Sequence, residues 1–182
     1  MSLIADVRKI AGDTVERIKA KEREIEAHKA ERPNLSDTRY AEIMDKLQGE
    51  LERIKYECQE AVRQRVEEYR KAVKAADALD GAKLTDDAQL LSGSFPLAVA
   101  DLDSMMERAA GNRTMEKLIS NYAAERGLNL AKPFYTAEQK VAAAAEFLNA
   151  YARNVCARPE YYDIWGTDEY FNDATPEEIR GE

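Results

Sequence analysis

Apolar side chains recur at alternating intervals of three and four residues at the start of the chain. This spacing is typical of a coiled-coil seam and predicts a helix over residues 2–31. The helix should end at Arg32-Pro33, because proline disfavours helix in the residue before it and lacks a backbone donor. Lys21 and His28 stand where leucine would stabilise more, so this helix needs a partner. The seam positions are Ile4, Val7, Ala11, Thr14, Ile18, Lys21, Ile25 and His28.

A second, longer helix is predicted over residues 37–79, with Ser36 as its N-cap. It outlasts the first arm by about thirteen residues, or roughly 20 Å, so its far end needs another surface to pack on. The loop of residues 32–36 is short enough to favour an antiparallel hairpin. The same heptads would also serve an open hairpin whose arms pair with a second copy. The second seam is Tyr40, Met44, Leu47, Leu51, Ile54, Cys58, Val62, Val66, Tyr69, Val73 and Ala76.

Shorter apolar patterns separated by turn residues follow the hairpin and predict a compact helical domain. The predicted helices cover residues 86–91, 99–110, 114–126 and 137–157. Alanines in the run 142–145 would let another helix approach closely. The expected core is Leu90, Phe95, Leu97, Leu102, Met106, Met115, Leu118, Ile119, Tyr122, Phe134, Val141, Phe147, Leu148 and Tyr151.

Residues with cap and turn chemistry mark the ends of these helices. Gly81 suits the left-handed position that follows a helix, and Gly127 is an expected stop. Thr85 and Thr114 are expected caps, and Thr136 begins the sequence Thr-Ala-Glu-Gln, which matches a capping box.

These patterns together predict an all-α protein, in which a long antiparallel helical hairpin is followed by a small helical domain. We place the hairpin in residues 1–80, the compact helical domain in residues 81–158 and an acidic, aromatic-rich tail in residues 159–182. Charged residues make up 34% of the chain, above the roughly 25% of ordinary soluble domains, which suits long solvated helices.

Negative charge is concentrated in the tail. The net charge is −8, and residues 159–182 hold eight acidic residues against one arginine. The rest of the chain is close to neutral, so no basic surface favours nucleic acid and we expect no direct nucleic-acid binding. The N-terminal residues are charged and contain no continuous apolar run, which predicts neither a signal peptide nor a membrane span. We therefore expect a cytoplasmic protein that does not bind membranes.

The tail also contains five of the fourteen aromatic residues. Buried aromatic side chains dominate interface energies and carboxylates steer encounters, so these residues could anchor a basic, grooved partner. Alternatively, the same aromatics fold back onto the chain's own helical domain. The tail aromatics are Tyr161, Tyr162, Trp165, Tyr170 and Phe171.

A search for catalytic chemistry gives no positive signal. The single histidine, His28, cannot supply a multi-histidine zinc site or a di-metal bundle, and no nucleotide-binding or calcium-binding motif is present. Cys58 and Cys156 are interpreted as free thiols that pack as small hydrophobes. We therefore expect no enzyme, no cofactor and no metal.

Three weaker patterns each have a structural alternative. Asp101 and Asp103 could bind a metal or act as helix-capping and solvated acids. Arg113 and Lys117 could bind an anion or serve as plain surface charge. The helix-turn-helix pattern in residues 114–149 lacks base-reading side chains and has a long linker, which disfavours DNA recognition.

Residues 83–128, KLTDDAQLLSGSFPLAVADLDSMMERAAGNRTMEKLISNYAAERGL, resemble a group of helical proteins encoded in bacterial prophages near their head and packaging genes. The resemblance lies in the SGSFPL turn and in the helix starts at DLD and NRTM. It implies a role in virion assembly, with a virion-associated location, and brings no catalytic residues.

We expect a non-enzymatic structural or assembly protein of phage type that acts through helix-mediated protein–protein interaction. Self-association should use the hairpin seam. The alternative is a regulatory adaptor or inhibitor that binds a basic protein partner through the tail. The candidate seam residues are Ile18, Ile25, Leu47, Leu51, Ile54, Val62, Val66 and Tyr69.

Overall fold

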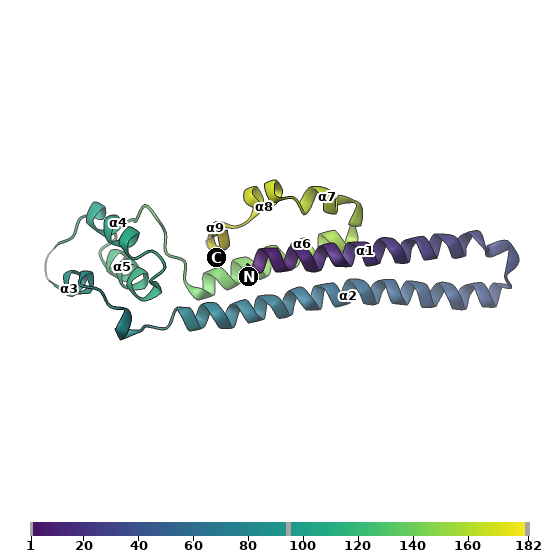
Figure 1. Cartoon of the computed structure of the whole chain (residues 1–182), viewed down its shortest axis with the longest axis horizontal. Helices are drawn as coiled ribbons and strands as arrows, with labels where there is room; N and C mark the ends of the chain where they lie inside the picture. Colours follow the sequence, from purple (N-terminus) through teal and green to yellow (C-terminus); the bar gives the residue numbers. More distant parts are fainter. Residues whose placement is uncertain (1, 94–95, 181–182) are drawn as a thin grey trace. The chain divides into compact units, whose positions relative to one another are not determined.

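The computed structural model describes residues 2–93 and 96–180, and every regular element in these ranges is helical, which confirms the all-α fold (Figure 1). Phe95, predicted to lie in the core, falls outside the described residues. The long helices are α1 (Leu3–Ala30), α2 (Asp37–Ala76) and α6 (Ala137–Ala157). The shorter elements are α3 (Asp87–Ser92), α4 (Val99–Arg108), α5 (Arg113–Glu125), α7 (Tyr162–Trp165), α8 (Asp168–Ala174), α9 (Glu177–Arg180) and the 3-10 turns η1 (Arg32–Asn34), η2 (Gly81–Lys83) and η3 (Pro159–Tyr161).

Helices α1 and α2 run antiparallel and form the predicted hairpin, joined through η1 (Figure 1). Every predicted seam position except Ala76 is buried or half-buried. The hydroxyl of Ser36 accepts a hydrogen bond from the backbone N–H of Arg39 at 3.3 Å, so this residue caps α2 as expected. Helix α2 ends at Ala76 rather than at residue 79.

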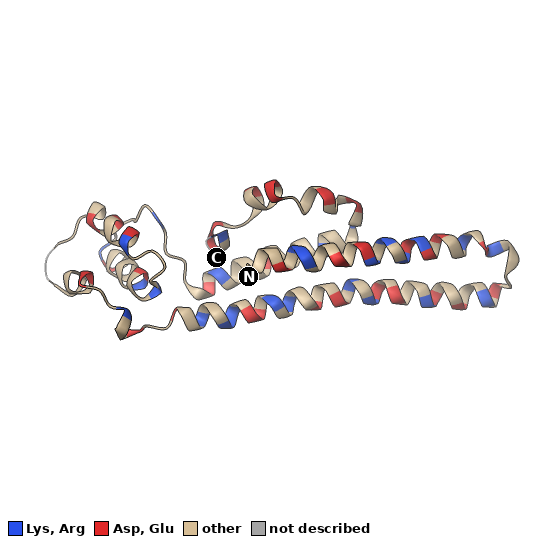
Figure 2. Ribbon diagram, in the orientation of Figure 1, with Lys and Arg blue, Asp and Glu red and all other residues tan. Residues whose placement is uncertain are grey.

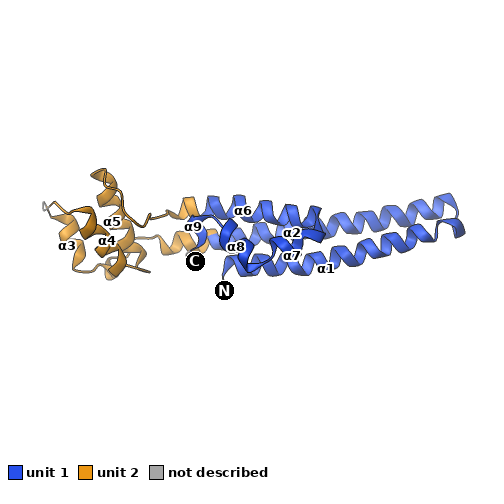
Figure 3. Cartoon of the chain, turned by 90° about the horizontal axis from the view of Figure 1, so that it is seen from above, with its two compact units in different colours: residues 1–69, 141–182 blue, residues 70–140 orange. Residues whose placement is uncertain are grey.

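The chain divides into two compact units with boundaries that differ from the expected ones (Figure 3). Unit 1 comprises residues 1–69 and 141–182, and unit 2 comprises residues 70–140. The expected boundaries at residues 80 and 158 assigned α6 to the compact domain. The structure instead packs the apolar face of α6 against α1 and α2, with Leu148 and Tyr151 in the core of the hairpin.

The part of unit 1 where α6 packs on α1 and α2 is called the base. Ala144 is fully buried there, which fits the expectation that the alanine run permits close helix approach. The third helix requires α1 to bury a second side besides its seam. Leu3 and Val15, which are not seam positions, are buried for this reason.

Unit 2 has its own core, formed by α4, α5 and the segments around them. Most of the predicted core residues lie in it, but Leu90 is 48% exposed and its prediction was wrong. In the short helix α3, Leu91 packs against the core. Because adjacent residues of a helix point to different sides, Leu90 faces outward. The buried hydrophobic residues of this core are Leu102, Met105, Met106, Ala109, Met115, Ile119, Tyr122 and Ala123.

The caps were predicted correctly at α6 and at the end of α5. Thr136 Oγ1 accepts from the N–H of Gln139 at 3.2 Å, and Gln139 Oε1 accepts from the N–H of Thr136 at 2.8 Å, which is a capping box. Gly127 has a φ of +64°, so it adopts the left-handed conformation that stops α5.

Other cap predictions were wrong. Gly81 begins the turn η2 and is not left-handed, because α2 has already ended before it. Thr114 lies inside α5, where Asn112 is the N-cap and its side chain accepts from the N–H of Met115 at 3.3 Å. Thr85 precedes Asp86, the N-cap of α3, and contributes its backbone carbonyl rather than its hydroxyl.

Candidate interaction surfaces

The acidic tail docks on helix α1 through Arg8. Its guanidinium donates to the backbone carbonyl of Gly166, with an Nε to oxygen distance of 3.0 Å, and pairs with the carboxylate of Asp168. The same guanidinium lies 5.0 Å from the ring centroid of Phe171. The Tyr162 hydroxyl donates to the carbonyl of Arg8 at 3.2 Å. The side chain and backbone carbonyl of Arg8 together therefore contact α7, α8 and the turn between them.

The inner aromatic side chains of the tail belong to the core of unit 1. Phe171 is 3% exposed and makes edge contacts with Phe147 and Tyr151 at centroid distances of 5.8 and 4.9 Å. Tyr162, Trp165 and Tyr170 pack against the same core while remaining half-buried. These aromatic residues pack on the chain itself, as the second of the two predictions for the tail expected. They pack on the hairpin base, however, and not on the compact domain.

An outer patch of the tail remains open to solvent. Tyr161 and Ile164 are 38% and 59% exposed, and the Tyr161 ring stacks on Trp165 at 5.3 Å. Exposed carboxylates of Glu160 and Asp163 flank them, and Figure 2 shows acidic residues along α7 and α8. We call Tyr161, Ile164, Glu160 and Asp163 the outer patch. Its composition suits a partner that is basic and partly apolar.

The predicted hairpin-seam residues lie along the inside of the hairpin of one chain. Ile18, Ile25, Ile54, Val62 and Val66 are buried. The other three candidates are only half-buried, and they are Leu47, Leu51 and Tyr69. Since most of the seam is already covered, the buried members are not available to a second chain while the hairpin stays closed.

Polar groups interrupt the seam in the distal hairpin, which we define as residues 19–50. Lys21 Nζ donates to Glu24 at 2.6 Å and to Glu50, across the hairpin, at 2.8 Å. These hydrogen bonds raise the pKa of Lys21, and the bond from Lys21 lowers the pKa of Glu50. The His28 ring stacks on Tyr40 with centroids 4.9 Å apart. The two residues that weaken the heptad pattern are therefore each matched by a partner.

The distal hairpin extends past α6 and the tail, which lie beside the base in both Figure 1 and Figure 3. Its α2 face carries Tyr40, Ile43, Met44 and Leu47, which we call the distal strip. Their spacing places them on one side of the helix, and each is half-buried. In the base, by contrast, α2 residues such as Ile54 and Val62 are buried. Two helices alone cover their shared apolar face incompletely, which leaves the distal strip accessible.

Charge does not oppose contact between copies at this end. Residues 19–50 include eight acidic and seven basic residues. Figure 2 shows the two signs interleaved along both arms. Examples of pairing are Lys21 with Glu24 and Lys29 with Glu26, with nitrogen to oxygen distances of 2.6 Å each.

The two cysteines are brought together in the base. Cys58 of α2 and Cys156 of α6 are both 2% exposed free thiols in the same core cluster. A hydrogen bond with Cys156 lowers the pKa of Cys58 against the opposing effect of burial. The same bond and burial raise the pKa of Cys156. The sequence predicted buried free thiols but gave no sign that they are neighbours.

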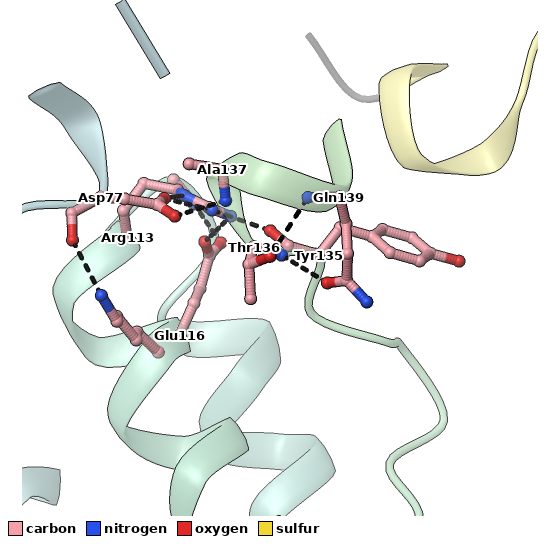
Figure 4. Close-up of polar contacts among 9 residues, drawn as sticks. Asp77, Arg113, Glu116, Tyr135, Thr136, Ala137 and Gln139 are labelled. Atoms are coloured by element: carbon pink, nitrogen blue, oxygen red, sulfur yellow. Dashed lines mark hydrogen bonds and ion pairs between the residues drawn. The ribbon is translucent and has the colours of Figure 1, made fainter. Parts of the chain in front are cut away.

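Asp77 organises a polar cluster in unit 2 that the sequence analysis missed (Figure 4). Its carboxylate accepts from Arg113 Nε at 2.8 Å and from the N–H of Ala137 at 2.7 Å. Its backbone carbonyl accepts from Lys117 at 3.2 Å, and Arg113 also donates to the carbonyl of Tyr135 at 2.9 Å. The predicted pair Arg113 and Lys117 thus does come together, but Asp77 of the same unit supplies the anion.

The remaining polar candidates make structural hydrogen bonds within unit 2. The carboxylate of Asp101 accepts from the N–H of Ala98 at 2.9 Å, and that of Asp103 accepts from the N–H of Ala131 at 2.8 Å. An open groove of about 720 Å³ also lies in unit 2, lined by α3 and α5 residues such as Leu91, Leu118 and Glu125.

Among the described residues, no group of three or more histidine, cysteine or acidic side chains is arranged to hold a metal ion. Within the same ranges, no helix has both the length and the apolar character needed to cross a membrane. Comparisons with protein families, curated proteins and solved structures gave no match to the chain.

Proposed function

We propose that the protein is a non-enzymatic helical assembly protein whose distal hairpin packs against a second copy. The observation that carries this proposal is the half-buried distal strip. A hairpin of two helices has no enclosed core, whereas two hairpins packed together form a four-helix bundle that does. A two-fold contact would place the same strip of each copy against the other, so one surface serves both partners.

The nearly equal charges of residues 19–50 support contact between identical surfaces, because neither copy repels the other strongly. The buried part of the seam at Ile18 and Ile54 stays within each chain in this arrangement. Of the candidate seam residues, the proposal keeps Leu47, which belongs to the distal strip, and Leu51, which adjoins the strip.

We further propose that this assembly belongs to virion morphogenesis in a phage or prophage. The resemblance of residues 83–128 to helical prophage proteins supports this assignment, and unit 2 contains that whole segment. The hairpin would then supply self-association, while unit 2 would be the part that contacts other assembly components.

Photo-crosslinking tests the contact directly. A photoreactive phenylalanine analogue placed at Ile43, in the distal strip, should crosslink chain to chain at residues 35–51 of the second copy. The same analogue at Tyr56, which is 65% exposed on α2 outside the strip, is the matched control and should give little product. Equal yields from both positions, or none from position 43, would refute contact through the strip.

A second function, an adaptor or inhibitor that binds a basic partner, is favoured by the outer patch. Trp165 is the single tryptophan and stacks on Tyr161, so its fluorescence reports on the patch. An arginine-rich helical peptide should change this fluorescence, and the double variant Tyr161→Ala with Ile164→Ser should weaken the response about tenfold, as for loss of an interface anchor. Identical binding curves for the wild type and the double variant would refute binding of a basic partner through the outer patch.

Point variants are required for this test because the tail is part of the fold. Truncation after Arg158 would remove Phe171 and Ile179, which are buried in the core of unit 1. A truncated chain would lose stability for that reason alone, whatever the tail binds.

A further inference from the structure

The open groove of about 720 Å³ in unit 2 is a surface that self-association through the hairpin does not use. It is lined by Leu91 of α3 and Leu118 of α5, which are half-buried, and by the buried side chain of Tyr122. Leu84, which precedes α3, also lines the groove and is 50% exposed. The described residues therefore leave an apolar surface open between these two helices.

The groove exists because α3 is too short to cover α5. Helix α3 has six residues and spans roughly 9 Å, whereas α5 has thirteen residues and spans roughly 20 Å. Lining residues follow helical spacing along one side of α5, at Leu118, Asn121, Tyr122 and Glu125. A further helix laid along this side would continue the layer of helices that α3 begins.

The charge of the groove is negative. Of the described residues that line it, two are charged, and both Asp86 and Glu125 are acidic. Asp86 is exposed and makes no capping hydrogen bond to α3, and within the described ranges it has no ion-pair partner. Its neighbour Asp87, by contrast, is paired with Arg108 at 3.0 Å. The Asp86 carboxylate is thus available to a partner.

Glu125, at the end of α5, is also largely available. Its side chain is 76% exposed, and the nearest basic group is that of Arg126, at 3.8 Å. An exposed pair at this distance is weak. The Arg126 guanidinium instead lies over the ring of Tyr122, 3.6 Å from its centroid. A basic side chain of a partner can therefore approach Glu125 from solvent.

We propose that the groove between α3 and α5 binds one amphipathic helix of a basic protein partner. Apolar side chains of that helix would pack on Leu91 and Leu118, and its lysine or arginine side chains would pair with the two carboxylates. A helix suits the site better than a small molecule, because an open groove does not enclose most of a small ligand. The inference rests on the proposed assembly function, within which it gives unit 2 its partner.

The test measures the fluorescence anisotropy of a fluorescein-labelled peptide as the full chain is added. The peptide has about sixteen residues of alanine and glutamine, with leucines spaced i, i+4 and i+7 and lysines at both ends. We expect saturable binding in the micromolar range that weakens as salt is raised, because salt screens exposed charges. A control peptide with glutamates in place of the lysines should bind about tenfold more weakly.

Variants of the lining residues separate charge from apolar contact. Asp86→Lys with Glu125→Lys should weaken binding of the lysine peptide about tenfold and should bind the glutamate peptide better than the wild type does. Leu84→Ser should weaken the lysine peptide about tenfold, as for loss of an interface anchor. The matched control is Leu79→Ser, because Leu79 is 61% exposed and does not line the groove, and it should bind like the wild type. Far-ultraviolet circular dichroism checks that each variant keeps its helices.

Several results would overturn the proposal. They include no saturable binding of the lysine peptide, or equal binding of both peptides to the wild type. Binding lost in Tyr161→Ala with Ile164→Ser but kept in Leu84→Ser would assign the peptide to the outer patch instead. Reduced self-association of Leu84→Ser in light scattering would assign the groove to a second copy. Light scattering of the wild type decides self-association separately, so the groove and the assembly function can fail independently.

Discussion

Lys21 shows how a residue that weakens a heptad can still belong to it. Its aliphatic stem lies in the seam, and its ammonium group reaches Glu24 and Glu50. Because Glu50 lies on the opposite arm, the pair favours one axial alignment of α1 on α2. The contribution to stability is small, since such partly exposed pairs are screened by solvent.

The Lys21–Glu50 pair predicts a dependence on pH. Its hydrogen bond lowers the pKa of Glu50 below the ordinary value of 4.5. This contribution to stability is thus present above the unfolded-state pKa and is lost as pH falls through the folded-state pKa. Chemical denaturation of the wild type and Glu50→Gln should show a wild-type advantage at pH 7 that shrinks toward pH 3. A difference that stays constant over this range would contradict the assignment.

Tyr151 carries a polar group that the core does not satisfy. Its hydroxyl is buried without a hydrogen-bond partner among the described residues, and burial raises its pKa. Tyr151→Phe should therefore raise the free energy of unfolding by about 1 kcal/mol, since the ring stays and an unsatisfied group is removed. Urea unfolding measures the change.

Tyr122→Phe is the matched control for that substitution. The Tyr122 hydroxyl accepts from the N–H of Leu97 at 3.3 Å, so its removal should lower stability. If both variants shift in the same direction, hydrogen bonding does not explain the difference.

At the scale of elements, the Arg8 side chain of α1 makes polar contacts that help to dock the tail. Arg8→Ala removes the bonds to Gly166 and Asp168 and the contact with Phe171. We expect a loss of about 1–3 kcal/mol and faster hydrogen exchange in residues 162–174. Lys9→Ala, at the exposed neighbouring position, should leave exchange in the tail unchanged. An unaltered tail in Arg8→Ala would show that the apolar contacts suffice.

The end of α2 and the start of α6 are joined within unit 2 by the carboxylate of Asp77. Asp77→Ala leaves Arg113 and the N–H of Ala137 without this partner, so it should destabilise unit 2 by about 3 kcal/mol. Asp80→Ala, which removes only a bond to the N–H of Ala82, should cost about 1 kcal/mol or less. Hydrogen exchange of residues 113–125 should be faster in Asp77→Ala than in Asp80→Ala. Equal exchange rates in the two variants would show that Asp77 does not organise the cluster.

For the whole molecule, local pattern predicted the helices, whereas their long-range partners were not predictable from it. The alternating spacing of three and four residues located α1, α2 and their shared seam, because apolar residues at this spacing lie on one face of a helix. The destination of α6 was missed, since an apolar face such as that of Leu148 specifies burial but not the surface that covers it. The roles of Arg8 and Asp77, and the burial of Cys58 and Cys156 in one core, were missed for the same reason.

The candidate surfaces were predicted in part. The aromatic content of the tail and the hairpin seam were recognised as apolar surfaces. Only the structure separates the buried members, such as Phe171 and Val62, from the accessible ones, such as Ile164 and Ile43. Which of these residues are buried depends on where the base ends along the hairpin. That position is known only once the packing of α6 and the tail on the hairpin is known.

Light scattering coupled to size exclusion, over a range of concentrations and under reducing conditions, tests the central claim most directly. We predict that the wild-type mass rises with concentration from 20.5 kDa toward twice that value. Ile43→Glu with Leu47→Glu should abolish the rise, while Tyr56→Glu should preserve it. A wild-type chain that stays at 20.5 kDa at every concentration would contradict self-assembly through the distal hairpin.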